Sequence, residues 1–277
     1  MSNEFKLNIV DQPINQNYVK LNIVDSPVVE VPDKIMKVDP RFHRLIRDRY
    51  SRLSSLEPDD AGIIKYIWEN MEDVTAQCFQ DLWVLYELKE KKNGFFVEFG
   101  ATNGLTISNT WLLERKYGWD GILSEPSPNF YPLLCLNRPE MDCSDLCVSD
   151  KTGDEIKFTI SSEAELSSRS EFYRSDKEVD RVVMVPTITL FDLLEKYKAP
   201  VDIDYLSIDT EGGEFETLKQ FFIENTKYSI KCITVEHNFH VTNREKIHML
   251  LVSNGYRRKF EYISAWDDFF ILETIDV

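Results

Sequence analysis

One short stretch constrains the fold of this chain more than any other, because an apolar run delivers an acid and two glycines into a predicted helix. Its sequence is Gly94-Phe-Phe-Val-Glu-Phe-Gly-Ala-Thr-Asn-Gly104. The apolar run predicts a buried strand, with Glu98 near its end and both glycines in the following turn. We expect Gly100 to permit the tight turn and Gly104 to permit close approach of a ligand. The pattern is typical of a strand–loop–helix unit that binds a small molecule.

Strand and helix patterns alternate from this unit to the end of the chain. Strands are expected at residues 95–99, 121–125, 142–148, 205–209, 232–236, 256–262 and 268–272. Helices are expected at residues 106–116, 129–136, 190–198, 214–224 and 243–253. The alternation predicts an α/β, Rossmann-like fold with an open, mostly parallel sheet. Residues 263–267 are too few for a helical crossover, so the last two strands should be antiparallel.

The segment 155–189 interrupts this alternation. It predicts a strand at 156–160, a polar stretch at 161–180 and a second strand at 182–187. The polar stretch is either a lid over a substrate or a solvated excursion. Long loops in compact domains are often functional, so the sequence gives the two interpretations equal weight.

The first 38 residues form an extension that contains a repeated hexamer. Lys-Leu-Asn-Ile-Val-Asp occurs at 6–11 and again at 20–25, and a proline stands two residues after each copy, at Pro13 and Pro27. The two copies are either short strands that dock on a partner or a second protomer, giving a homo-oligomer, or a loosely ordered extension without a catalytic role. The prolines and the small number of repeats favour the second interpretation.

Residues 39–92 predict a helical cap region in front of a cofactor-binding domain at 93–277. Asp39 and Pro40 are suited to begin a first helix as cap and first-turn residue. A second helix is expected from Pro58 to about Met71. A third is expected over 75–92, with Gly94 as its C-terminal glycine.

Acidic strand ends indicate which cofactor the domain binds. Glu98 would repel a phosphate and attract an amine, and the GxGxxG pattern of pyrophosphate sites is absent. Glu125 ends the second strand and is suited to accept hydrogen bonds from both ribose hydroxyls. S-adenosylmethionine carries an ammonium and a sulfonium group, so these acids favour it over a nicotinamide dinucleotide.

Further polar residues follow the two later strands and are candidates for catalysis. Asp209 ends one strand, and Glu236, His237 and Asn238 end the next, so all four should emerge at the same edge of the sheet. His237 is a candidate general base, with a structural role as the alternative. Asp209, Glu236 and Asn238 could equally hold Mg²⁺ through oxygen ligands. For Glu214 we expect only stabilisation of a helix N-terminus.

Charge and cysteine usage limit the partners and the compartment. The formal net charge of −16 disfavours nucleic acid as a general partner. The five cysteines contain no CxxC pair, which favours reduced thiols in a cytoplasmic protein over a zinc site. No signal peptide and no apolar run long enough to span a membrane are visible.

Several motifs together resemble the FkbM family of S-adenosylmethionine-dependent methyltransferases. The resemblance covers about residues 78 to 272. Its motifs are Phe95-Phe-Val-Glu-Phe-Gly-Ala-Thr-Asn-Gly104, Ser108-Asn-Thr-Trp-Leu-Leu-Glu114, Trp119-Asp-Gly-Ile-Leu-Ser-Glu-Pro126, Val148-Ser-Asp-Lys-Thr-Gly153, Leu206-Ser-Ile-Asp-Thr-Glu-Gly-Gly-Glu214, Val235-Glu-His-Asn238 and Trp266-Asp-Asp-Phe-Phe270.

The resemblance implies a class I methyltransferase fold, with a seven-stranded sheet and an antiparallel final strand. It also implies methylation of a hydroxyl oxygen, commonly on a sugar or a natural product. By position, the cofactor would contact Glu98, Gly100, Ala101, Thr102, Asn103, Gly104, Glu125, Ser149 and Asp150. Thr102 stands where family members often vary between polar and small residues.

Two other classes of function remain as alternatives. A binding or scaffold protein can keep a cofactor fold without catalysis, because fold alone does not determine function. A nicotinamide-dependent oxidoreductase is disfavoured by the absence of GxGxxG.

Overall fold

The computed structural model describes residues 7–9, 21–23, 39–49, 58–161, 168–171, 179–210, 212–261 and 264–273. The chain divides into two compact units, Met1–Met71 and Glu72–Val277. This division falls inside the segment expected to be one helical cap region. The first and second helices of that segment belong to the first unit and the third belongs to the second.

In the first unit, the two copies of the repeated hexamer pair with each other. Strands β1 (Leu7–Ile9) and β2 (Leu21–Ile23) are antiparallel, with Leu7 opposite Ile23. Docking of these two copies on a partner or a second protomer stays a prediction. The rest of residues 1–38 lies outside the described residues.

Two predicted helices of the first unit are confirmed. Helix α1 (Pro40–Arg49) begins where the sequence predicts, with the backbone N–H of Arg41 donating to Asp39 Oδ1 over 2.8 Å. Helix α2 (Pro58–Asn70) follows, and the rings of Phe42 and Trp68 lie 5.1 Å apart.

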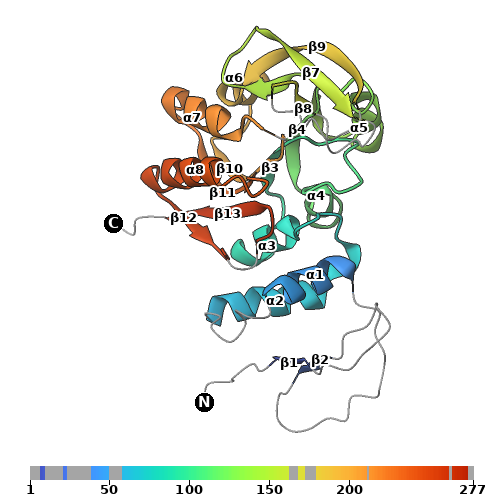
Figure 1. Cartoon of the computed structure of the whole chain (residues 1–277), viewed down its shortest axis with the longest axis vertical. Coiled ribbons are helices and arrows are strands. Elements are labelled where there is room, and N and C mark those ends of the chain that lie inside the picture. The colour runs from blue at the N-terminus through green and yellow to red at the C-terminus, as the bar shows by residue number, and fades with distance from the viewer. Residues whose placement is uncertain are drawn as a thin grey trace. The chain divides into compact units, whose positions relative to one another are not determined.

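In the second unit, the described residues form one seven-stranded sheet in the order β12-β13-β11-β10-β3-β4-β5 (Figure 1). The bounds are β3 Phe95–Phe99, β4 Asp120–Ser124, β5 Asp142–Ser144, β10 Asp202–Ile208, β11 Ser229–Glu236, β12 Tyr256–Lys259 and β13 Asp267–Leu272. Neighbouring strands from β11 to β5 are parallel, whereas β13 is antiparallel to both β11 and β12. The predicted fold, with its antiparallel last strand, is confirmed.

Helices cover both faces of this sheet. Their bounds are α3 Gln80–Glu87, α4 Trp111–Tyr117, α5 Tyr131–Asn137, α6 Leu190–Lys196, α7 Glu214–Glu224 and α8 Val241–Ser253. Apolar side chains of α6, α7 and α8 form one core cluster with the central strands. On the opposite face, Trp83 of α3 stacks on Phe269 of β13 with ring centroids 5.0 Å apart. Both faces are therefore buried, as the apolar runs predict.

A second, smaller sheet lies after β5. Its order is β6-β9-β7-β8, with bounds β6 Cys147–Ser149, β7 Glu155–Ser161, β8 Ser168–Arg169 and β9 Val179–Thr189. The two strands expected at 156–160 and 182–187 are confirmed. The strand expected at 142–148 is instead two strands, β5 and β6, which belong to different sheets. Residues 162–167 and 172–178 of the polar stretch are outside the described residues, and a lid there stays a prediction.

Three local expectations are corrected. The third helix begins only at Gln80, because Phe79 adopts a left-handed backbone with φ 58°. Gly94 does not end that helix; a Cβ there would lie 2.6 Å from the Trp119 ring, so the glycine makes room for the indole. The helix expected from residue 106 begins only at Trp111. Ile107 is left-handed with φ 57°, which breaks the helical path before it.

Candidate functional site

A cavity lies at the carboxyl ends of the central strands. Chain connections leave β3 toward β4 and β5 on one side, while β10 and β11 lie on the other. In open α/β sheets, ligands bind where the strand order reverses in this way. The cavity measures about 210 Å³ and is lined by Gln77, Phe99, Gly100, Thr102, Ile107, Ser124, Glu125, Pro126, Cys147, Val148, Phe158, Arg169, Asp209, Thr210, Glu236, Asn238 and Trp266.

The loop at residues 100–104, here called the glycine loop, reaches this cavity through Gly100 and Thr102. Gly100 has φ 71°, and a Cβ on it would overlap the carbonyl oxygen of Asp209. Its N–H donates to the carbonyl of Ser124 over 3.1 Å. Gly100 therefore permits the tight turn that the sequence predicts, and it also permits close contact between two strand ends.

We expect Gly100→Ala to lower the free energy of unfolding by about 4 kcal/mol or more, because the methyl group has no space beside Asp209. Gly153 offers a matched control, since it also has positive φ, at 85°, but a Cβ there meets nothing within 4 Å. Gly153→Ala should cost only about 1 to 2 kcal/mol, from the left-handed backbone alone. Urea denaturation of the two variants measures the difference, and equal losses would contradict it.

Glu125 lies in the cavity wall immediately after β4. Its side chain is 4% exposed. Its two oxygens accept from the backbone N–H groups of Ser127 (2.8 Å) and Thr102 (2.9 Å). Burial raises the pKa of Glu125 to about 7, and the same two hydrogen bonds act in the opposite direction. The carboxyl group therefore links the glycine loop to the second strand end at the cavity.

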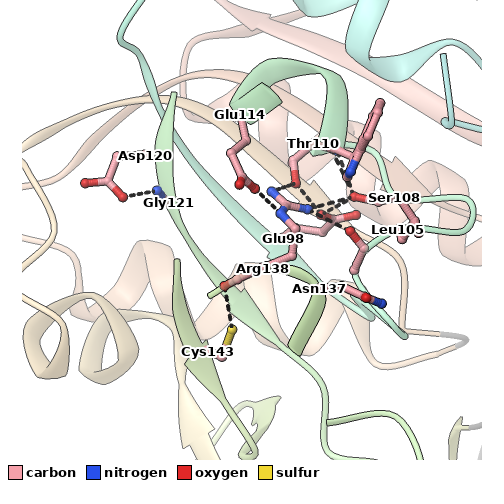
Figure 2. Close-up of polar contacts among 12 residues, drawn as sticks. Glu98, Leu105, Ser108, Thr110, Glu114, Asp120, Gly121, Asn137, Arg138 and Cys143 are labelled. Atoms are coloured by element: carbon pink, nitrogen blue, oxygen red, sulfur yellow. Dashed lines mark hydrogen bonds and ion pairs between the residues drawn. The ribbon is translucent and has the colours of Figure 1, made fainter. Parts of the chain in front are cut away.

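Glu98 does not line the described cavity. Its oxygens accept from the Ser108 hydroxyl (3.1 Å), the Asn109 N–H (2.8 Å) and the Thr110 hydroxyl (2.5 Å). Burial raises the pKa of Glu98, and the Arg138 charge opposes this shift. The structure thus supports an internal role in which Glu98 holds the segment before α4 (Figure 2).

The remaining glycine-loop residues are not among those that line the cavity. A Cβ on Gly104 would lie 2.5 Å from Leu134 and 2.8 Å from Arg138, so this glycine makes room for protein side chains. Ala101 is buried and donates its N–H to Ser124. The Asn103 side-chain oxygen accepts from the backbone of the next turn at 105 and 106. Cofactor contact by these three residues stays a prediction.

Asp209, Glu236 and Asn238 come together at the cavity, as the sequence predicts. Ile208 of β10 pairs with Val235 of β11, so Asp209 and Glu236 follow directly at neighbouring strand ends. Among the described residues, no group of three or more His, Cys, Asp or Glu side chains is arranged to hold a metal ion. The magnesium prediction is therefore not supported.

His237 is adjacent to Glu236 in sequence, but its imidazole is buried outside the cavity lining. Its Nδ1 accepts from the N–H of Phe239 over 3.0 Å. Its Nε2 lies 3.9 Å from Asp268 Oδ1, and Asp268 is itself paired with Arg244 over 2.6 Å. Burial lowers the pKa of His237, with the Asp268 charge acting in the opposite direction. These contacts fix the turn 237–239.

Two further predicted residues, Ser149 and Asp150, lie next to the cavity. The Ser149 hydroxyl donates to Asp150 over 3.0 Å and accepts from Arg169 over 3.2 Å. Arg169 itself lines the cavity, as does Phe158. The smaller sheet thus contributes one wall of the site through β7 and β8.

Gln77 lines the cavity without having been predicted to do so, and Trp266 lines it as well. Trp266 is held there because its carbonyl accepts from the N–H groups of His237 (2.8 Å) and Asn238 (3.2 Å).

Glu214 behaves as expected, since its carboxylate accepts from the Gly212 N–H and the Thr210 hydroxyl at the start of α7. All five cysteines are free thiols. Within the described residues, no helix has the length and apolar character needed to cross a membrane.

Comparison with known proteins identifies the family. A family model described as the methyltransferase FkbM domain matches residues 98–258, more than half of the chain. No curated protein matches the chain. The match spans the glycine loop, Glu125, Asp209 and Glu236.

Solved structures resemble the chain more weakly. A METTL16 methyltransferase domain is 12% identical with a TM-score of 0.44, covering 87% of this chain and 93% of that chain. A methyltransferase from Geobacter sulfurreducens is 12% identical with a TM-score of 0.41, covering 85% and 98%. TrmK from M. capricolum, in complex with S-adenosyl-homocysteine, is 14% identical with a TM-score of 0.37, covering 70% and 66%. Because these TM-scores lie below 0.5, the assignment rests on the family model: the chain belongs to the FkbM family of methyltransferases.

Proposed function

We propose that the protein transfers a methyl group from S-adenosylmethionine to a hydroxyl oxygen of a sugar, glycan or small natural product. The observation that carries the proposal is the buried carboxyl group of Glu125 at a cavity over the reversal of strand order. Calorimetric titration of the cofactor and its demethylated product tests it.

The chemistry of the cavity lining fits this cofactor. Glu125, Asp209 and Glu236 supply negative charge, and the cofactor carries a sulfonium and an ammonium group. Phe99, Ile107, Val148 and Phe158 supply apolar surface for a nucleoside. Glu125 would hold the ribose hydroxyls, and the backbone around Gly100 and Thr102 would flank the methionine part.

The reaction asks the protein mainly for positioning and for removal of one proton. The cofactor, when bound, supplies an electrophilic methyl group. Asp209 would orient the acceptor hydroxyl, and Glu236 would accept its proton as the methyl group is transferred. Glu236 is suited to this role because its side chain is buried at the cavity, where water competes little for the hydroxyl. We propose no metal ion in this step.

Charge supports a neutral, hydroxyl-rich acceptor over nucleic acid. Arg169 is the single basic side chain among the described residues that line the cavity. Polyanions require several such residues, and the chain as a whole has a formal net charge of −16. The five free thiols are consistent with a reducing, cytoplasmic environment.

Cofactor affinity is expected to depend on pH through Glu125. Since its pKa in the folded protein, about 7, lies above the ordinary value of 4.5, this group stabilises the ligand-free fold at low pH. That contribution is lost as the pH rises through about 7. Hydrogen bonds from two hydroxyls require the ionised carboxylate, so the Kd should fall by about tenfold from pH 6 to pH 8.

Titrations at pH 6, 7 and 8 measure this dependence. Glu125→Gln is the matched control, because it keeps the shape of the side chain and cannot ionise. Its Kd should not change with this profile. The same tenfold change in the Gln variant would show that another group is responsible.

A further inference from the structure

A fully buried arginine lies behind the glycine loop and is not used by the proposed reaction. Arg138 follows the last residue of α5, and its side chain is 0% exposed. It forms an ion pair with Glu114, and its guanidinium lies 5.5 Å from the centre of the Phe96 ring. Figure 2 shows Arg138 surrounded by Glu98, Glu114, Ser108 and Thr110. Burying a charged side chain carries a desolvation penalty, and the partners around Arg138 offset that penalty.

The partners of Arg138 lie at both ends of one loop segment. One terminal nitrogen donates to the carbonyl of Gly104 over 3.0 Å and to the Ser108 hydroxyl over 3.3 Å. The other donates to the Thr110 hydroxyl over 3.2 Å. Between these contacts lies Ile107, which has a left-handed backbone and lines the cavity. One guanidinium therefore fixes the path of a cavity-lining segment that is not helical.

Asn137, which precedes Arg138 in the sequence, contacts the same loop one residue before the Gly104 carbonyl. The side-chain N–H of Asn137 donates to the carbonyl of Asn103 over 2.9 Å. Asn137 and Arg138 thus bind two successive carbonyls, at 103 and 104, from the end of α5. On the cavity side, Glu125 holds the N–H of Thr102. The loop is therefore fixed from behind by α5 and from the front by a proposed cofactor ligand.

We propose that Asn137 and Arg138 form a clamp that holds residues 102–110 in the cofactor-binding conformation and so sets cofactor affinity. The inference rests on the proposed function, because it names the cofactor as the ligand affected. Neither residue lines the cavity, so both are positioning residues that act through the loop. Removing a clamp contact lowers the population of the competent loop, and the apparent Kd rises in proportion.

Asn137→Ala is the sharper test, since Asn137 is only half-buried and the substitution removes its side-chain hydrogen bond to the Asn103 carbonyl. The Kd for S-adenosylmethionine should rise about fivefold, as expected for one net hydrogen bond. At saturating cofactor, kcat should stay within about twofold, because the reacting groups are untouched. Arg138→Lys should raise the Kd further, since an ammonium group cannot reach Gly104, Ser108, Thr110 and Glu114 together.

Asn254→Ala is the matched control. Asn254 also lies at the end of a helix, α8, and its side-chain N–H donates to a backbone carbonyl, that of Leu250, over 2.8 Å. Its cofactor Kd should equal that of the wild type. A merely structural role for Asn137 would lower the melting temperature of both variants alike and leave both Kd values unchanged, which would overturn the clamp.

Amide hydrogen exchange of the ligand-free proteins gives a readout that does not depend on cofactor. Exchange at residues 102–110 should be faster in Asn137→Ala than in the wild type and unchanged in Asn254→Ala. Unchanged exchange in Asn137→Ala would overturn the clamp. If the wild type binds no cofactor, the proposed function fails, and this comparison alone decides whether the clamp exists.

Discussion

Glu125→Ala is expected to bind S-adenosylmethionine about 100-fold less tightly than the wild type. The variant removes the carboxylate that would accept two ribose hydroxyls, and hydrogen bonds to a charged group contribute about 1.5 to 3 kcal/mol each. It also releases the N–H of Thr102, so the glycine loop loses its contact with the second strand end. Thermal-shift titration with cofactor measures the affinity.

The melting temperature without cofactor separates the two effects of this substitution. A lower melting temperature alone would reflect loss of the Thr102 and Ser127 contacts. An affinity equal to that of the wild type would contradict the assignment of Glu125 to the ribose.

Glu236→Gln is expected to lower kcat about 100-fold while the cofactor Kd stays within about twofold. The substitution keeps the shape of a buried side chain and removes the carboxylate proposed to accept the proton, and general base catalysis contributes about 100-fold or more. Single-turnover methyl transfer at saturating cofactor measures the rate.

His237→Ala distinguishes the two candidate bases. Its imidazole contacts Phe239 and Asp268 and does not line the cavity, so loss of the ring should mainly affect the turn 237–239. A kcat that falls about 100-fold in His237→Ala and not in Glu236→Gln would restore the histidine as the base.

The sequence predicts much of the sheet because several of its strands are local apolar runs. Residues 95–99 form β3 as expected, and the short connection before β13 correctly indicates an antiparallel strand. The junction at 142–148 is harder to predict, since nothing local reveals that its two halves pair with different partners. That choice depends on contacts with β4 and β9, far away in sequence.

Site residues follow the same division between local and distant causes. Glu125, Asp209 and Glu236 are predictable because parallel strands end at one edge of the sheet. Neither His237 nor Glu98 lines the cavity. Side chains of adjacent residues on a strand point to opposite sides, so a place at or near a strand end does not by itself put a side chain in the cavity. The partners of Glu98 are chosen by a turn ten to twelve residues later. Arg138 gives no signal in the sequence, because its role depends on loops 28 to 34 residues away.

The most direct test of the account is calorimetric titration of S-adenosylmethionine and S-adenosylhomocysteine into the wild-type protein, with a nicotinamide dinucleotide as the control ligand. We predict micromolar binding of both cofactor forms, one site per chain, and no heat from the dinucleotide. Absence of binding by both S-adenosyl compounds would contradict the methyltransferase account and favour a protein that uses this fold as a scaffold.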